Sequence, residues 1–244
     1  MTQRQDWEDL AALDPYWAIL SAPGRRFRRW CPDEFFETGR EEIAHVMDTA
    51  RRLAYPVGRD SALDFGCGVG RATRALADHF ETCVGVDISE TMIAEARRLA
   101  GGGTRCHFVT IQGGDLAQFE SGQFDLVYSV LVLQHLEGSD AIRTVITELV
   151  RVCARRGLLV FQLPRRLPVT TRLALRARTY RVLRGLGVPR ETLYNRLRLH
   201  PSRMHFLDSD EVAALLRSTG AAILHTEAKT DESGSSATYY VTHL

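Results

Sequence analysis

The feature that most constrains the fold is a run of three alternating glycines directly after a short apolar segment. It reads Leu63-Asp64-Phe65-Gly66-Cys67-Gly68-Val69-Gly70-Arg71, and an alanine-rich stretch of good helix propensity follows it. A tight turn from strand to helix needs backbone angles that glycine adopts without steric penalty. A side chain at Gly66 or Gly68 would also keep a nucleotide-like ligand away from the backbone and the helix N-terminus. The segment therefore predicts a strand, a ligand-binding turn and a helix.

Short apolar runs alternate with longer helical stretches from this turn to residue 163. The five strand candidates are residues 62–65, 83–86, 107–111, 124–129 and 158–163. Their alternation with helices is typical of a parallel sheet covered on both faces. Two later candidates, 221–226 and 238–242, flank the polar loop 231–236 and predict a closing hairpin. The sequence thus predicts an α/β fold with a doubly wound sheet, mostly parallel, that ends in a C-terminal antiparallel hairpin.

The segments on either side of this core predict additions to a single domain. Residues 1–58 are rich in aromatic side chains and include a helical run, so we expect an N-terminal helical cap. Residues 59–163 form the ligand-binding core. The strand alternation then breaks at two prolines, and residues 164–205 are expected to form an arginine-rich helical insert, or lid. Residues 206–244 complete the core sheet.

Composition narrows the class of protein. The chain has 244 residues, of which 45% are hydrophobic and 25% charged, and no apolar run approaches the roughly 18 residues that a membrane span needs. The polar N-terminus has no secretory pattern, so we expect a soluble, cytoplasmic protein. The five cysteines are scattered and form no CxxC pair, which predicts reduced thiols and no metal site.

Charge is distributed unevenly along the chain. The formal net charge is +1, yet residues 164–205 hold eleven arginines against the single acid Glu191, a local charge of +10. Arginine pairs bidentately with carboxylate and phosphate, so this insert suits an anionic acceptor or partner. The alternative is a usage bias, because the chain has thirty arginines and only Lys229 as a lysine, which multiplies arginine on any solvated surface. The sequence leaves both interpretations open.

Two further motifs follow the second and third strand candidates. Val84-Gly85-Val86-Asp87 ends in a carboxylate 19 residues beyond Gly68, and an acid at that place accepts hydrogen bonds from ribose hydroxyls. The dinucleotide pattern G-x-G-x-x-G fails here, because its last position is Arg71. Gln112-Gly113-Gly114-Asp115-Leu116 offers a second acid for the amino group of an adenine ring. An ordinary loop or cap aspartate is the equally weighted alternative for Asp115.

Together with 124–129 and Leu133-Gln134-His135-Leu136, these motifs make residues 60–163 resemble class I S-adenosylmethionine-dependent methyltransferases, in the same order along the chain. The resemblance implies a Rossmann-like, seven-stranded sheet and S-adenosylmethionine as cofactor. It places the glycine turn against the methionine part, Asp87 on the ribose and Ile88 on the adenine. The cofactor-binding residues it implies are Asp64, Gly66, Gly68, Gly70, Arg71, Asp87, Ile88, Asp115, Leu116 and Ser129.

Methyl transfer from a sulfonium is an in-line displacement, so the enzyme aligns the acceptor, excludes water and removes a proton where needed. His135 lies near the C-terminal edge of the fourth strand and is a candidate general base, since imidazole titrates near neutral pH. The alternative is a structural histidine that closes the pocket or bonds to the backbone. His205, at the end of the insert, is a second candidate. Tyr16, Trp17 and Trp30 either cover the cofactor or only pack the cap onto the core.

The leading hypothesis is O- or N-methylation of a small-molecule acceptor. A protein that keeps the cofactor fold but acts by binding RNA or another anionic partner is the alternative from another class, and an NAD-dependent oxidoreductase is less favoured. DNA-base methylation is disfavoured, because Ser129-Val130-Leu131-Val132 lacks the Asn/Asp-Pro-Pro-Tyr/Phe and Pro-Cys elements. RNA is disfavoured because no RNA-binding motif accompanies the basic charge. The sequence leaves the acceptor and the oligomeric state open.

Overall fold

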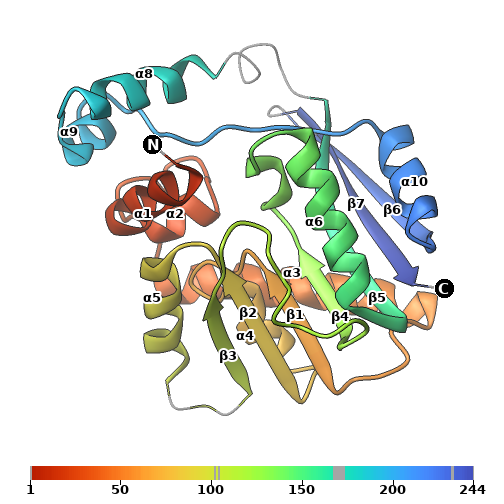
Figure 1. The fold of residues 1–244 in the computed structure, drawn as a ribbon. Helices are drawn as coiled ribbons and strands as arrows, with labels where there is room; N and C mark the ends of the chain where they lie inside the picture. Colours follow the sequence, from red (N-terminus) through yellow and green to blue (C-terminus); the bar gives the residue numbers. More distant parts are fainter. Residues whose placement is uncertain (1, 102, 104, 167–173, 232–233, 244) are drawn as a thin grey trace.

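The computed structural model describes residues 2–101, 103, 105–166, 174–231 and 234–243. Its centre is one seven-stranded sheet in the order β3-β2-β1-β4-β5-β7-β6 (Figure 1). The strands are β1 Ser61–Phe65, β2 Thr82–Asp87, β3 Cys106–Thr110, β4 Phe124–Ser129, β5 Cys153–Arg166, β6 Ala221–Asp231 and β7 Gly234–His243. The pairs among β1 to β5 are parallel, whereas β7 runs antiparallel to both β5 and β6. The predicted fold class and terminal hairpin are confirmed.

Helices cover both faces of the sheet. Those of the core are α3 Pro32–Leu53, α4 Arg71–Leu76, α5 Glu90–Ala100, α6 Ser139–Val152 and α10 Ser209–Ser218. The apolar side chains of α6 and α10 share one buried cluster with one face of the strands, and those of α3 and α4 share another with the opposite face. Figure 1 shows α6 in front of the sheet and α3 behind it. Burial on both faces explains why the strands read as continuous apolar runs.

The hairpin differs from the prediction in its length. We expected residues 231–236 to form a loop, but β6 continues to Asp231 and β7 begins at Gly234, so the turn is tighter. Residues 232 and 233 lie outside the described residues. The long antiparallel pairing with β7 also extends β5 beyond the predicted 158–163, because every added residue gains a neighbouring strand.

Four helices lie together beyond the C-terminal ends of the parallel strands: α1 Gln3–Leu13, α2 Pro15–Ile19, α8 Leu175–Gly185 and α9 Arg190–Asn195. We call them the cap lobe (Figure 1). They come from the predicted cap and the predicted insert, whose residues 167–173 lie outside the described residues. The lobe is tied to the sheet domain by Glu8, whose carboxylate accepts hydrogen bonds from the backbone N–H groups of Glu90 and Thr91, at the start of α5.

Acidic side chains of α1 hold the arginine-rich insert in place. Asp9 is fully buried and accepts hydrogen bonds from the Tyr180 hydroxyl (3.0 Å), Arg184 Nε (3.2 Å) and Arg190 Nη1 (3.3 Å). Asp6 pairs in the same way with Arg181. Buried charges are stable only when they are paired and hydrogen-bonded. Much of the insert's positive charge therefore serves to dock it on the N-terminal helix.

Replacing Asp9 with alanine is expected to release the insert. The change leaves two guanidinium groups and a hydroxyl without their buried acceptor, and breaking a buried ion pair in this way costs about 3–5 kcal/mol. We expect trypsin to cleave after the arginines of α8 several-fold faster than in the wild type, as followed by mass spectrometry. Asp140→Ala is the matched control, since Asp140 is exposed and pairs only with Arg143 on the same helix. Equal cleavage rates in all three proteins would contradict this role of Asp9.

Neither a membrane span nor a clustered metal site occurs within the described residues. Over these ranges no helix is both long enough and apolar enough to cross a membrane. They also hold no cluster of three or more histidine, cysteine, aspartate or glutamate side chains with the proximity that a metal ion requires. All five cysteines are free thiols, and burial raises the pKa of Cys153 to about 12, which keeps that thiol protonated.

Candidate active site

A cavity lies at the C-terminal edge of the parallel strands; we call it the inner cavity. Its lining comes from the glycine turn, the end of β2, the loop after β4 and the first two helices of the cap lobe. Ligands bind at this edge in open α/β sheets because the connecting loops diverge there.

The glycine turn is shaped by both conformation and close packing. Gly66, Gly68 and Gly70 have φ values of +79°, +54° and +84°, the left-handed region that favours glycine. A Cβ atom at Gly66 would lie 2.4 Å from both γ-methyl carbons of Val132, and one at Gly68 would lie 2.5 Å from Ile19 Cδ1. The first two glycines line the inner cavity, whereas the third packs on β3. The turn thus brings bare backbone to the cavity floor.

Replacing Gly66 with alanine is expected to destabilise the fold and weaken ligand binding. The left-handed conformation alone costs a residue with a Cβ about 1–2 kcal/mol, and Val132 must also move. Urea unfolding should show a loss of at least that size, and S-adenosylhomocysteine should bind more weakly. Gly220→Ala is the matched control, because Gly220 has φ +74° and a Cβ added there would have nothing within 4 Å. If the control loses as much ligand affinity as Gly66→Ala, the turn does not form the binding surface.

Asp87 closes one side of the inner cavity at the end of β2. Its carboxylate accepts the backbone N–H groups of Gly68 (2.9 Å) and Ser89 (2.8 Å), one on each oxygen. Burial raises the pKa of Asp87, while these backbone hydrogen bonds oppose the rise. A carboxylate has about four acceptor positions, so two remain for a ligand. Asp87 therefore both fastens the glycine turn and offers acceptors for ribose hydroxyls, and these features fit an adenosyl group.

The adenine side of the predicted site is only partly assembled as expected. Ile88 lines the inner cavity together with Met92, Ile111 and Gly113. Asp115 and Leu116 do not line it. The carboxylate of Asp115 is exposed and accepts the backbone N–H of Ala117 (2.8 Å), and Leu116 is fully buried in the core. The structure places Asp115 in the position of an ordinary loop aspartate, and its contact with adenine stays a prediction.

Three more predicted cofactor contacts lie behind the turn instead of on the cavity wall. Asp64 is buried and accepts a hydrogen bond from Thr73 Oγ1 (2.6 Å), and burial raises the pKa of Asp64 to about 6. Arg71 is directed toward α3, where it pairs with Glu42 (2.9 Å). Ser129 Oγ is buried and has no hydrogen-bond partner among the described residues. Asp64 and Arg71 support the turn from its back, and the cofactor roles of all three stay predictions.

His135 stands between the inner cavity and a second one. It ends the short helix η1 Leu133–His135 after β4, and its Nδ1 lies 2.7 Å from the backbone oxygen of Arg203. A carbonyl oxygen only accepts, so Nδ1 carries the hydrogen and Nε2 keeps a free lone pair. Burial lowers the pKa of His135, which keeps the ring neutral at pH 7. The geometry and the protonation state are those of a general base.

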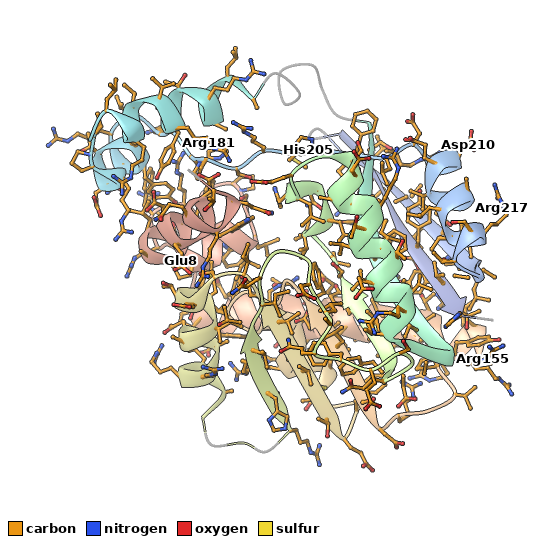
Figure 2. All side chains as sticks on the ribbon, viewed as in Figure 1. Glu8, Arg155, Arg181, His205, Asp210 and Arg217 are labelled. Carbon is orange, nitrogen blue, oxygen red and sulfur yellow. The ribbon has the colours of Figure 1, made fainter. Side chains whose placement is uncertain are left out.

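The second cavity, the outer cavity, lies between α1, η1 and the segment 201–205. Both cavities share Gln3, Trp7, His135 and Leu136 in their linings. His205 lines only the outer cavity, and its backbone N–H donates to the Gln134 oxygen (2.6 Å). Figure 2 shows His205 on the segment that returns from the cap lobe to the sheet domain. Because the cavities share this wall, a ligand in one cavity would lie next to a ligand in the other.

The aromatic residues predicted as a possible roof pack the cap instead. Tyr16 stacks on Phe35 with ring centroids 4.4 Å apart, and Trp17 and Trp30 contact other rings of the cap lobe and α3. None of the three lines either cavity. The aromatic residue that lines both cavities is Trp7, which was not among the predicted site residues; its ring lies edge-on to His135 at 5.3 Å. The sequence signal for Trp7 was its position four residues after Gln3, which places both side chains on one face of the same helix.

Comparison with known proteins identifies the family. The family described as "Methyltransferase domain" matches residues 63–161. A ubiquinone biosynthesis O-methyltransferase from Bordetella avium is 28% identical over 87% of this chain and 80% of its own length. A chloroplastic tocopherol O-methyltransferase from Arabidopsis thaliana is 34% identical, but the match spans only 40% of this chain and 28% of that protein.

Solved structures share the fold over nearly the whole chain. Magnesium protoporphyrin IX methyltransferase from Synechocystis PCC 6803, solved with bound S-adenosylhomocysteine, has a TM-score of 0.64 at 18% identity and covers 99% of this chain and 98% of its own. The N-methyltransferase NodS from Bradyrhizobium japonicum, with the same ligand, has a TM-score of 0.62 at 20% identity and covers 100% and 99%. S-adenosylmethionine is the methyl donor of this family. The chain carries a methyltransferase domain at residues 63–161 and shares the fold of the class I S-adenosylmethionine-dependent methyltransferases.

Proposed function

We propose that this protein transfers a methyl group from S-adenosylmethionine to an oxygen or nitrogen atom of a small-molecule acceptor. The observation that carries the proposal is the position of His135, which borders both cavities with Nδ1 held by a backbone carbonyl. The inner cavity takes the methyl donor and the outer cavity takes the acceptor. When bound, the donor supplies an electrophilic methyl group on a sulfonium.

Each protein group then has a defined task. Asp87 accepts hydrogen bonds from the ribose, and the bare backbone at Gly66 and Gly68 lets the donor approach the sheet edge. His135 Nε2 takes the proton from the acceptor's hydroxyl group as the methyl group is transferred, or from an ammonium group before its nitrogen attacks the methyl group. The Arg203 carbonyl holds Nδ1–H throughout, so the ring keeps its orientation as it becomes charged. Trp7 and Gln3 of α1 keep water from the shared wall.

The relatives support a small acceptor and are compatible with methylation of either oxygen or nitrogen. One is named as an O-methyltransferase of ubiquinone biosynthesis, and a structural neighbour is named as an N-methyltransferase. An RNA- or partner-binding protein without turnover is the remaining alternative, and a cytoplasmic location stays a prediction of the sequence.

The test is methyl transfer from donor carrying a radiolabelled methyl group into fractionated cell extract. We expect label in the low-molecular-weight fraction, in proportion to protein added, and strongly reduced label with His135→Ala. Bound donor without any labelled product would favour the non-catalytic alternative. Label confined to RNA or protein would contradict a small acceptor.

A further inference from the structure

Eight of the eleven arginines of the insert divide into three groups by what they contact. Arg181, Arg184 and Arg190 pair with aspartates of α1 and hold the lobe together. A second group is exposed: Arg176, Arg178, Arg196 and Arg198. Arg203 belongs to neither group: it lines the outer cavity, as Arg181 also does, but unlike Arg181 it forms no ion pair with a described residue. The total charge of the insert therefore says little about the acceptor, whereas the unpaired Arg203 at the cavity is informative.

Arg203 lacks a counter-ion. Among the described residues no acidic side chain lies within ion-pair distance of it, and its Nε is buried without a hydrogen-bond partner. Burial and the neighbouring guanidinium of Arg181 lower the pKa of Arg203, although Asp6 and Glu137 at the same cavity oppose this. Figure 2 shows Arg181 at the junction of α8 with α1. A guanidinium group at the cavity wall, with its Nε buried and unpaired, would be stabilised by an anion in the cavity.

The position of Arg203 relates it directly to the reacting atoms. Its backbone carbonyl holds His135 Nδ1 at 2.7 Å, while its side chain borders the same cavity as the ring. Arg203 thus contacts the proposed base through its carbonyl group and lines the same cavity with its guanidinium group. A compact molecule with an oxyanion at one end and a hydroxyl or amine at the other would contact both the guanidinium of Arg203 and the ring of His135. The apolar lining from Trp7, Leu10 and Leu136 suits a ring or a short carbon chain between these groups.

We propose that Arg203 binds an oxyanion of the acceptor, a carboxylate or a phosphate, and that the acceptor is an anionic small molecule held in the outer cavity with its nucleophile at His135. This inference rests on the proposed function, because it places the acceptor in the outer cavity. Arg203 determines specificity for the acceptor's charge and contributes its carbonyl, but not its side chain, to the orientation of the base.

Binding of matched probe pairs tests the proposal without knowledge of the natural acceptor. The full chain is saturated with S-adenosylhomocysteine and titrated by calorimetry or ligand-observed NMR. The probes are ortho, meta and para hydroxybenzoates, each paired with its neutral hydroxybenzamide, and hydroxyphenyl phosphate as the phosphate arm. We expect at least one anion to bind at least about tenfold more tightly than its neutral counterpart. The arm with the larger preference distinguishes carboxylate from phosphate.

Variants attribute the preference to one side chain. Arg203→Gln should remove the preference, and Arg203→Lys should retain part of it, since lysine keeps the charge but not the planar fork. Both variants keep the backbone carbonyl, so their affinity for S-adenosylhomocysteine should be unchanged. Arg196→Gln is the matched control, because Arg196 is exposed and lines neither cavity. It should behave as the wild type.

The possible outcomes separate this inference from the proposed function. Equal binding of anions and neutral partners by the wild type, absence of binding by every anion, or a preference that survives Arg203→Gln would overturn the role of Arg203. An equal loss in Arg196→Gln would show a general effect of surface charge and overturn it as well. Failure of the wild type to bind S-adenosylhomocysteine would instead remove the proposed function on which the inference rests.

Discussion

An Asp87→Ala variant is expected to bind S-adenosylhomocysteine about 100-fold to 10,000-fold more weakly than the wild type. In the proposed complex two ribose hydroxyls lose a charged acceptor, and each such hydrogen bond contributes about 1.5–3 kcal/mol. The backbone N–H of Gly68 also loses its acceptor, which loosens the glycine turn. Isothermal titration calorimetry measures the affinity, and circular dichroism checks that the variant is folded.

Asp125→Ala separates ligand binding from loss of backbone hydrogen bonds. Asp125 Oδ2 accepts the backbone N–H groups of Asp60 (2.8 Å) and Ser61 (3.1 Å) at the start of β1, the opposite edge of the sheet. The two aspartates therefore have the same local task, but only Asp87 lines the inner cavity. We expect the control to lose stability and keep its affinity. Comparable affinity losses in both variants would show that Asp87 acts through the fold alone.

A His135→Gln variant is expected to lose a factor of about 10² to 10⁴ in kcat while its affinity for S-adenosylhomocysteine changes less than about threefold. The glutamine amide still donates to the Arg203 carbonyl, but it cannot accept the acceptor's proton. The rate is measured with the acceptor fraction that the wild type labels. His107→Gln controls for the loss of a histidine elsewhere, since His107 is exposed on β3 and lines neither cavity.

The pH profile gives a second readout of the same residue. Burial, and to a lesser degree the charge on His205, lower the pKa of His135 below its ordinary value of 6.5. The base is therefore unprotonated at higher pH, and kcat/KM should fall only as pH drops through this lowered pKa. The acid limb should lie below pH 6.5 in the wild type and be absent in His135→Gln. An unchanged limb in the variant, or a kcat close to that of the wild type, would assign His135 a structural role.

The sheet could be predicted from the sequence because its signals are local. Strand β4 was expected at 124–129 and lies at Phe124–Ser129. The glycine turn and Asp87 were also predictable, because backbone conformation and strand-end position depend on residues close in the sequence. The bounds of β5 and of the hairpin were less predictable, because they are set by pairing between distant segments.

The outer cavity could not be predicted, because its wall joins parts of the chain that lie far apart in sequence. Nothing in residues 3–13 indicates that Asp9 meets Arg184 and Arg190, or that Trp7 reaches His135. The predicted arginine charge was real, but its interpretation needed the pairing partners that neutralise it. The candidates His135 and His205 were placed by resemblance and by position; the structure brings both to the outer cavity, and their catalytic roles stay predictions.

The division of the two cavities between chain segments bears on how such proteins diversify. The segment that matches the family, 63–161, supplies most of the inner cavity, whereas α1 and residues 201–205 supply most of the outer one. With the donor in the inner cavity and the acceptor in the outer one, as proposed, mutations in these flanking stretches would change acceptor choice while the donor site is kept. A match confined to residues 63–161 therefore compares donor sites and leaves most of the outer cavity uncompared.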